Sequence, residues 1–313
     1  MSGSAKKIVT YSLKIVITLI LLIYIIDKLN FESFLKLVRE AQLIYIIIAL
    51  LILAFSYFVN TYAWRLLLGA QGIKVPLSKL ASYYLIGLFF NNFLLSSVGG
   101  DIVKAYQLAR YTQKTVDSSV SIVASRFATI FALLILCLIS SIIGNKLEVA
   151  GSLFFFLAFL CSLILMFIFF NINFLNWLKS WFNSFRSARV RDLIFQIHSS
   201  VSSYKNNPLV VFKVVIFSLT FQIISVLIPY VISLALGLKI SIFYFLIFIP
   251  LIRIVILLPI SFNGLGLREG AYVTLFSQIG VPPEMSFSIS ILGYFMLTCI
   301  SLIGGILYLF SKR

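Results

Sequence analysis

Residues 241–266 read SIFYFLIFIPLIRIVILLPISFNGLG, an apolar stretch that ends in a cluster of Pro, Ser, Asn and Gly. Clusters of this kind end helices, yet the apolar part is long enough to enter a lipid bilayer. Irregular backbone at membrane depth persists only where protein buries it or a water-filled cavity faces it. The stretch therefore predicts a broken helix in a membrane, either two joined half-helices or a re-entrant hairpin that enters and leaves by the same face.

Another broken stretch, which comes first in the chain, and six apolar runs complete the pattern. In this first broken stretch, apolar residues 80–95 meet SSVGGD at 96–101, and a helix-like piece continues to about Thr112. The apolar runs are long enough to cross a hydrocarbon core of about 30 Å. They are 8–26, 43–68, 116–143, 149–171, 209–236 and 284–310. We expect an all-α polytopic membrane protein with about six spanning helices, forming one transmembrane domain over 1–313.

The composition agrees with a membrane protein. Of 313 residues, 61% are hydrophobic and 11% are charged, whereas soluble domains have about 45–50% and 25%. These values exclude a soluble globular enzyme and a disordered chain. The net charge is +16, but the basic residues are scattered between apolar runs, which excludes a nucleic-acid binder. The cysteines and the single histidine show no metal-ligand spacing, so we expect no metal and no cofactor.

The charge distribution favours two re-entrant hairpins. With a cytoplasmic N-terminus, this topology places thirteen basic residues inside and five outside, the bias typical of membrane proteins. If either broken stretch spanned the membrane, a basic cluster would move outside. We therefore expect both termini in the cytoplasm, in a bacterial cytoplasmic (inner) membrane. Residues 31–40 and the cytoplasmic segment 172–208 have the pattern of interfacial helices.

The order of elements repeats along the chain. The motif GIKV at 72–75 precedes the first broken stretch, and GLKI at 237–240 precedes the second. Three crossings in each half would invert the second half relative to the first, and inverted repeats with broken helices are typical of transporters. The predicted inverted halves are 1–143 and 149–313.

Four cations at membrane depth are candidate functional residues: Lys104, Arg126, Arg253 and Arg268. A charge at the bilayer centre costs at least about 2.5–3.5 kcal/mol, so such residues face a cavity, a partner or a pathway. The expected hairpin tips contain Gly99, Gly100, Asn263, Gly264 and Gly266. Glycines there would permit close backbone approach and hinge movement.

Two acids, Asp101 and Glu269, lie at the same tips and leave two interpretations open. In the first, the charges only neutralise one another, Asp101 with Arg126 or Lys104 and Glu269 with Arg253 or Arg268. In the second, the surplus of two cations holds an anionic group, assisted by free N–H groups at the helix starts near the tips.

Two runs resemble a known family. They are LLSSVGGDIVKAY at 94–106, with Arg126 in the next helix, and LPISFNGLGLREGA at 258–271, followed by GVPP at 280–283. Both are similar to the flippase-like proteins of the lysylphosphatidylglycerol synthase transmembrane region family. The resemblance covers nearly the whole chain and implies movement of aminoacylated or other phospholipids between leaflets. Because the chain ends at Arg313, we expect a stand-alone unit without the synthase domain, and a lipid-linked sugar is an equally open substrate.

Residues and resemblance together lead us to expect a lipid translocase and not an enzyme. The four cations would hold an anionic or zwitterionic head group between the two hairpin tips, while Asp101 and Glu269 orient those cations or bind an ammonium group. The alternative is a membrane enzyme, with one of these acids catalytic, or a glycosyltransferase-associated subunit acting on a lipid-linked substrate. Expected partners are membrane lipids, with a lipid-modifying enzyme or glycosyltransferase as a further candidate, and no nucleic acid.

Overall fold

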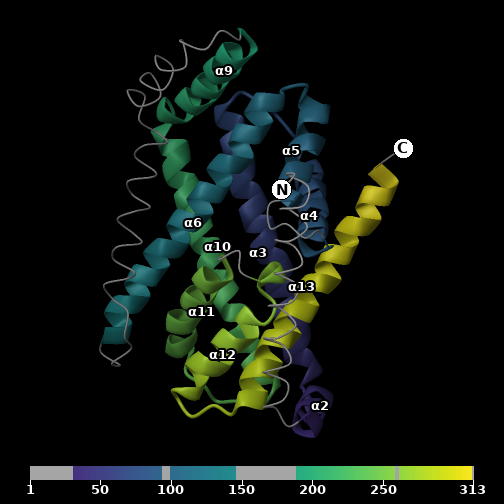
Figure 1. Cartoon of the computed structure of the whole chain (residues 1–313), viewed down its shortest axis with the longest axis vertical. Helices are drawn as coiled ribbons and strands as arrows, with labels where there is room; N and C mark the ends of the chain where they lie inside the picture. The colour runs from purple at the N-terminus through teal and green to yellow at the C-terminus, as the bar shows by residue number, and fades with distance from the viewer. Residues whose placement is uncertain (1–30, 94–98, 146–187, 258–260, 312–313) are drawn as a thin grey trace, which may run out of the picture. The chain divides into compact units, whose positions relative to one another are not determined.

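Four long apolar helices dominate the computed structural model, which describes residues 31–93, 99–145, 188–257 and 261–311 (Figure 1). They are α3 (Leu43–Ala70), α6 (Thr115–Asn145), α10 (Pro208–Ala235) and α13 (Pro283–Ser311). Each is long and apolar enough to cross a membrane, and each matches one of the predicted spans within two residues. The all-α membrane class is therefore confirmed. The predicted spans 8–26 and 149–171, and residues 172–187 of the segment 172–208, lie outside the described residues.

The first broken stretch contains two helices that lie antiparallel. They are α4 (Leu77–Phe93) and α5 (Gly99–Thr112). At the ends away from the connection, the start of α4 and the end of α5, the Lys79 ammonium lies 3.9 Å from the centroid of the Tyr111 ring. We call these the open ends of the pair. At the opposite ends, the Gly100 N–H donates to Asn91 Oδ1 at 2.8 Å. These contacts define the first helical hairpin, whose connecting residues 94–98 lie outside the described part of the chain.

The second broken stretch forms a hairpin of the same kind. Its elements are α11 (Ile242–Leu257), the short 3-10 helix η1 (Phe262–Gly264) and α12 (Leu267–Ser277). Near the open ends, the rings of Phe245 and Phe248 pack against Phe276 with centroid distances of 5.0 and 5.2 Å. Near the tip, Ile256 approaches Gly264. The α12 helix also packs along α13 (Figure 1).

The two glycines of the predicted repeat motifs end their spanning helices in the same way. Gly72 after α3 has a φ of 70° and Gly237 after α10 has a φ of 75°. In each case the next residue donates its N–H at 2.9 Å to a carbonyl five positions earlier, Leu68 and Ser233 respectively. This is the left-handed helix end that glycine favours. The order helix, glycine turn, hairpin, spanning helix is thus observed twice.

The counterpart helices α3 and α10 run antiparallel. The Gln42 N–H, just before α3, donates to the carbonyl of Ala235 at the end of α10, at 2.9 Å. Further along α3, Tyr62 packs against Phe217 near the start of α10, with ring centroids 4.9 Å apart. The first residues of each helix therefore lie beside the last residues of the other.

The described residues divide into two compact units. One consists of the described residues within Met1–Phe55, Leu88–Gly100 and Ile224–Arg313, and the other of those within Ser56–Gly87 and Asp101–Ile223. In the second unit, α9 (Ala188–Lys205) packs against α6. There a buried cluster joins α3, α6, α9 and α10 through Ala63, Leu67, Val120, Ala124, Val201, Tyr204 and Val214.

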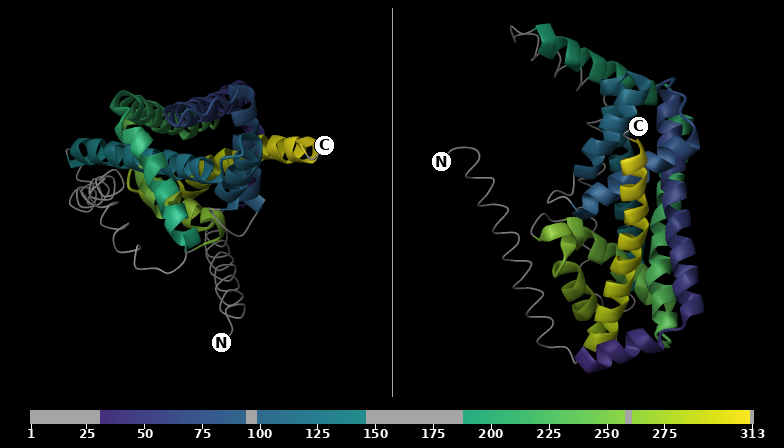
Figure 2. Two further views of the ribbon diagram at one scale, coloured as in Figure 1. Left: turned by 90° about the horizontal axis from the view of Figure 1, so that it is seen from above. Right: turned by 90° about the vertical axis from the view of Figure 1, so that its right-hand side faces the viewer.

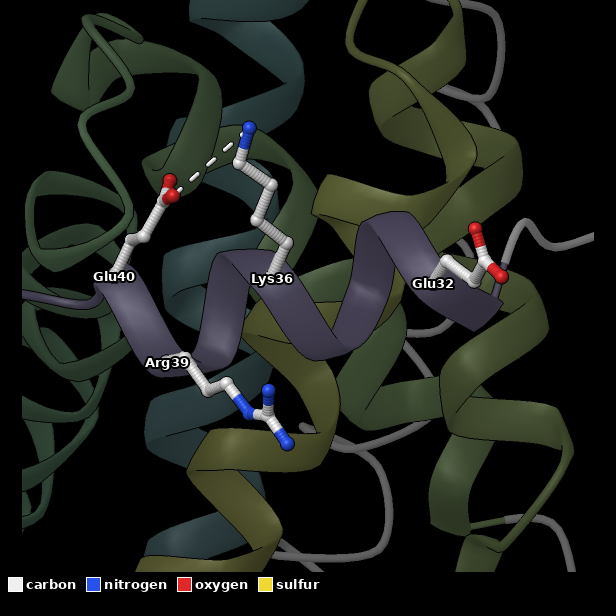
Figure 3. Close-up of a pocket in the computed structure, with 4 residues that line it drawn as sticks. All are labelled: Glu32, Lys36, Arg39 and Glu40. Atoms are coloured by element: carbon white, nitrogen blue, oxygen red, sulfur yellow. Dashed lines mark ion pairs between the residues drawn. The ribbon is translucent and has the colours of Figure 1, made fainter.

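The helix predicted at 31–40 is present as α2 (Phe31–Glu40), which in the first unit contacts α13 (Figure 2), while its interfacial location stays a prediction. Its polar face carries both signs of charge, and Lys36 Nζ lies 3.9 Å from Glu40 Oε1 (Figure 3). With Glu32 and Arg39 these side chains line an open hollow of about 390 Å³. Both members of the ion pair are largely exposed, so the pair contributes little to stability.

Candidate functional site

Asp101 in the first turn of α5 holds two cations. Its Oδ1 lies 2.6 Å from Lys104 Nζ, and its Oδ2 accepts a hydrogen bond from Arg126 Nη1 of α6. Helix geometry places Lys104 beside Asp101 because residues three apart share a face. Only 12% of the Asp101 side chain is accessible. Two of the predicted cations and one predicted acid therefore form a single charged group, which we call the Asp101 cluster.

Aromatic rings fix the position of Lys104 in this cluster. Its ammonium lies 5.0 Å from the Tyr84 ring centroid and 6.0 Å from that of Trp64, within the range of cation–π attraction. The Tyr84 hydroxyl accepts a hydrogen bond from Asn60 Nδ2 at 2.8 Å, and Trp64 Nε1 donates to Ser121 Oγ at 3.0 Å. Sequence reasoning missed these rings; polar Asn60 inside an otherwise apolar run was the available signal.

Arg126 is the most accessible member of the Asp101 cluster. Its side chain is 39% accessible, compared with 15% for Lys104. Arg126 also lies eleven positions after the start of α6 at Thr115, or about 16 Å along the axis at 1.5 Å per residue. A guanidinium group thus lies deep along a spanning helix and is open on one side.

Glu269 is the centre of the second charged group, in the first turn of α12. The residue is fully buried, and its Oε2 accepts the Gly266 N–H at 2.6 Å. Its Oε1 accepts hydrogen bonds from Arg268 Nη2 at 2.5 Å and from Arg268 Nε at 2.9 Å. The Ser290 hydroxyl of α13 also donates to Oε1, at 3.3 Å. We call these residues the Glu269 cluster.

Arg268 lies in the first turn of α12, and Arg253 lies in the preceding helix α11. The Arg268 guanidinium lies 4.2 Å from the Tyr294 ring centroid, and its side chain is only 12% accessible. Arg253, Arg268 and Glu269 all lie within electrostatic range of Tyr272. Of the two pairings predicted for each acid, Asp101 makes both, while Glu269 pairs with Arg268. Each acid is therefore paired with at least one predicted cation, and anion binding stays a prediction.

One backbone N–H near each expected tip has a side-chain partner. Asn91 accepts the N–H of Gly100, and Glu269 accepts that of Gly266. Sequence reasoning did not foresee these partners because they depend on the folded hairpins. Anion binding by the helix starts stays a prediction. Gly99, Gly100, Gly264 and Gly266 are all buried.

Asparagine side chains connect the two hairpins in the first unit. Asn263 Nδ2 donates to Asn92 Oδ1 at 3.0 Å, and Asn92 Nδ2 donates to Ser301 Oγ of α13 at 2.9 Å. Asn92 lies at the end of α4 and Asn263 lies in η1, so the contact joins one hairpin to the tip of the other. Asn263 has a φ of 48°, in the left-handed region that asparagine tolerates.

Comparison with known proteins identifies relatives along most of the chain. A family described as "Lysylphosphatidylglycerol synthase TM region" matches residues 11–305. The chain is also similar to the UPF0104 membrane protein of Methanothermobacter thermautotrophicus, with 23% identity over 269 residues and coverage of 79% of each chain. No solved structure matches the chain.

Proposed function

Because the chain belongs to the lysylphosphatidylglycerol synthase TM region family, we propose that it is a lipid translocase. It moves a polar lipid with an anionic or zwitterionic head group between the leaflets of the bacterial cytoplasmic membrane. The observation that carries this proposal is the Asp101 cluster, in which a buried carboxylate holds Lys104 and partly accessible Arg126. Charges of this kind in a membrane protein mark substrate pathways.

Cations outnumber the carboxylate by one around each acid, which suits a lipid phosphate. The Asp101 cluster has a formal charge of +1. The Glu269 cluster is neutral by itself and reaches +1 together with Arg253 of α11. A phosphodiester head group brings one negative charge. The acids keep the cations in position before the lipid arrives, and a pre-organised site loses less entropy when it binds.

The arrangement of helices supports alternating access by an inverted pair of halves. Insertion of the hairpins α4–α5 and α11–α12 as re-entrant elements is supported by their course, in which the first residues of one helix lie beside the last residues of the other. The antiparallel course of α3 and α10 is the relationship that inversion requires of counterpart helices. Cytoplasmic termini follow from the distribution of basic residues.

The paired state of both carboxylates favours transport over catalysis. Asp101 binds two cations, and Glu269 accepts bonds from Arg268, Gly266 and Ser290. A general acid or base must exchange a proton with substrate, whereas both carboxylates here are held by several hydrogen bonds and ion pairs within the protein. Formation of product by protein in detergent would support an enzyme instead, since transport requires two leaflets.

Head-group transfer in proteoliposomes tests the proposal. The assay follows fluorescent phosphatidylglycerol that becomes accessible to a membrane-impermeant quencher. We expect Arg126→Gln to slow transfer by about 10-fold, because a charge-assisted hydrogen bond to phosphate contributes about 1.5–3 kcal/mol. Lys213→Gln in α10 is the control, since it removes a cation outside both clusters. A folded Arg126→Gln protein with the wild-type rate would overturn the proposal.

A further inference from the structure

An open groove of about 800 Å³ lies where α3 ends, within the second unit. Its lining includes Tyr62, Arg65 and Ala70 of α3, the following turn from Ile73 to Pro76, and Tyr111 at the end of α5. The turn begins at Gly72, whose left-handed backbone directs the chain away from the helix axis. The groove is separate from the Asp101 and Glu269 clusters, because none of their charged residues lines it.

The groove is basic. Arg65 and Lys74 line it with exposed side chains, and none of its lining residues is acidic. Lys79 stands next to it, with its ammonium 3.9 Å from the centroid of the lining Tyr111 ring. Three cations without an acid among the lining residues create a positive potential that attracts anions.

The remaining lining suits an amphiphile. Partly exposed Leu66, Ala70 and Val210 supply apolar surface, while Tyr62, Tyr111 and Asn207 supply polar atoms. The groove lies at the end of a helix long and apolar enough to span the membrane, so it opens at the boundary between hydrocarbon and water. Tyrosine and long basic side chains are typical of that level, where a lipid phosphate resides.

We propose that this groove binds an anionic lipid of the adjoining leaflet, with its phosphate between Arg65 and Lys74. The apolar wall contacts the first part of an acyl chain, and Tyr62 and Tyr111 border the head group. A lipid fits better than a soluble phosphate because the apolar residues would otherwise face water in part. This site does not depend on the proposed transport activity, since it uses none of the residues assigned to it.

Lipid binding by the purified full chain in detergent tests the site. Native mass spectrometry compares phosphatidylglycerol and phosphatidylcholine with identical acyl chains. We expect Arg65→Gln/Lys74→Gln to reduce phosphatidylglycerol affinity by at least about 10-fold and to leave phosphatidylcholine binding unchanged. The matched control is Lys213→Gln/Lys239→Gln, which loses the same charge outside the groove and should retain wild-type affinity.

Three outcomes would overturn the proposal. The first is wild-type phosphatidylglycerol affinity in the double groove variant, and the second is equal loss of affinity in the control. Displacement of the lipid by millimolar inorganic phosphate would assign the groove to a free anion and also overturn it. If the double variant fails to fold, Lys74→Glu on the exposed turn takes its place and should weaken phosphatidylglycerol binding at least as much. The proteoliposome assay of Arg126→Gln tests a different residue and a different property. Failure of the groove proposal and failure of the transport proposal are therefore distinguishable.

Discussion

Asn263, at the tip of the second hairpin, donates its side-chain amide to Asn92 Oδ1 at 3.0 Å, across 171 positions of sequence. Asn92 is buried, and its own amide donates to Ser301 of α13. The two asparagines and the serine therefore form a continuous series of hydrogen bonds from η1 through α4 to α13. In a protein whose hairpins move during transport, these hydrogen bonds would have to break or move together with the hairpins.

Replacing Asn263 separates the contribution of this hydrogen bond from that of its backbone. Asn263→Gly keeps the left-handed φ accessible and removes the amide, so we expect it to lower the free energy of unfolding by about 1 kcal/mol. Asn263→Ala adds the cost of a left-handed alanine, about 1–2 kcal/mol more. Chemical denaturation in detergent measures both. An equal decrease in the free energy of unfolding in the two variants would show that the positive φ of residue 263 does not affect stability.

Features set by local sequence were predictable, and features set by tertiary packing were not. The spanning helices follow from apolar length, and Lys104 beside Asp101 follows from helix spacing. The pairing of Arg126 with Asp101 was one of two options, because it depends on how α5 packs against α6. Trp64, Tyr84 and Ser290 lie in apolar helices whose sequences do not distinguish these residues from their neighbours. Their contacts with Lys104 and Glu269 form only when helices distant in sequence pack together.

Gly264 at the second tip is expected to tolerate no side chain. Its φ is 76°, and an added Cβ would lie 2.7 Å from Ile256 Cγ2. Gly264→Ala therefore combines the left-handed cost of about 1–2 kcal/mol with overpacking of about 1–3 kcal/mol. Gly280→Ala is the matched control, because it has the same φ of 76° with nothing within 4 Å.

Thermal unfolding in detergent should order these proteins as wild type, Gly280→Ala and Gly264→Ala, from most to least stable. Adding Ile256→Ala to Gly264→Ala removes the clash but creates a cavity, so the combined loss should be smaller than the sum of the two single losses. Equal destabilisation by the two glycine variants would contradict the steric argument.

Glu269 and Arg268 should show strong energetic coupling. Glu269→Gln leaves the Arg268 guanidinium, only 12% accessible, without its charge partner, and breaking a buried pair in this way costs about 3–5 kcal/mol. The double variant Arg268→Gln/Glu269→Gln removes both charges and should recover part of that loss. A double-mutant cycle on unfolding free energies in detergent measures the coupling. Additive single losses would show that the two side chains act independently.

Tyr204 of α9, outside the spanning helices, is expected to reduce stability through its hydroxyl. The side chain is fully buried, and the hydroxyl has no hydrogen-bond partner among the described residues. An unsatisfied buried polar group costs about 1–3 kcal/mol. Tyr204→Phe keeps the ring in the cluster that joins α3, α6, α9 and α10 and removes the hydroxyl. We expect it to raise the free energy of unfolding by about 1 kcal/mol at neutral pH.

The same substitution should change the response to alkaline pH. Burial, and secondarily the negative charge of Asp117, raise the pKa of Tyr204 above its ordinary value of 10. In the unfolded chain this tyrosine ionises near pH 10, whereas in the folded protein it stays neutral, so unfolding releases a proton and stability falls as the pH rises above 10. Tyr204→Phe removes this contribution, and its advantage over wild type should grow between neutral pH and about pH 11. Tyr106→Phe, which alters a residue that is 63% exposed, is the control and should show no such growth. An advantage that stays constant over this pH range would mean that Tyr204 ionises as readily in the folded protein as in the unfolded chain.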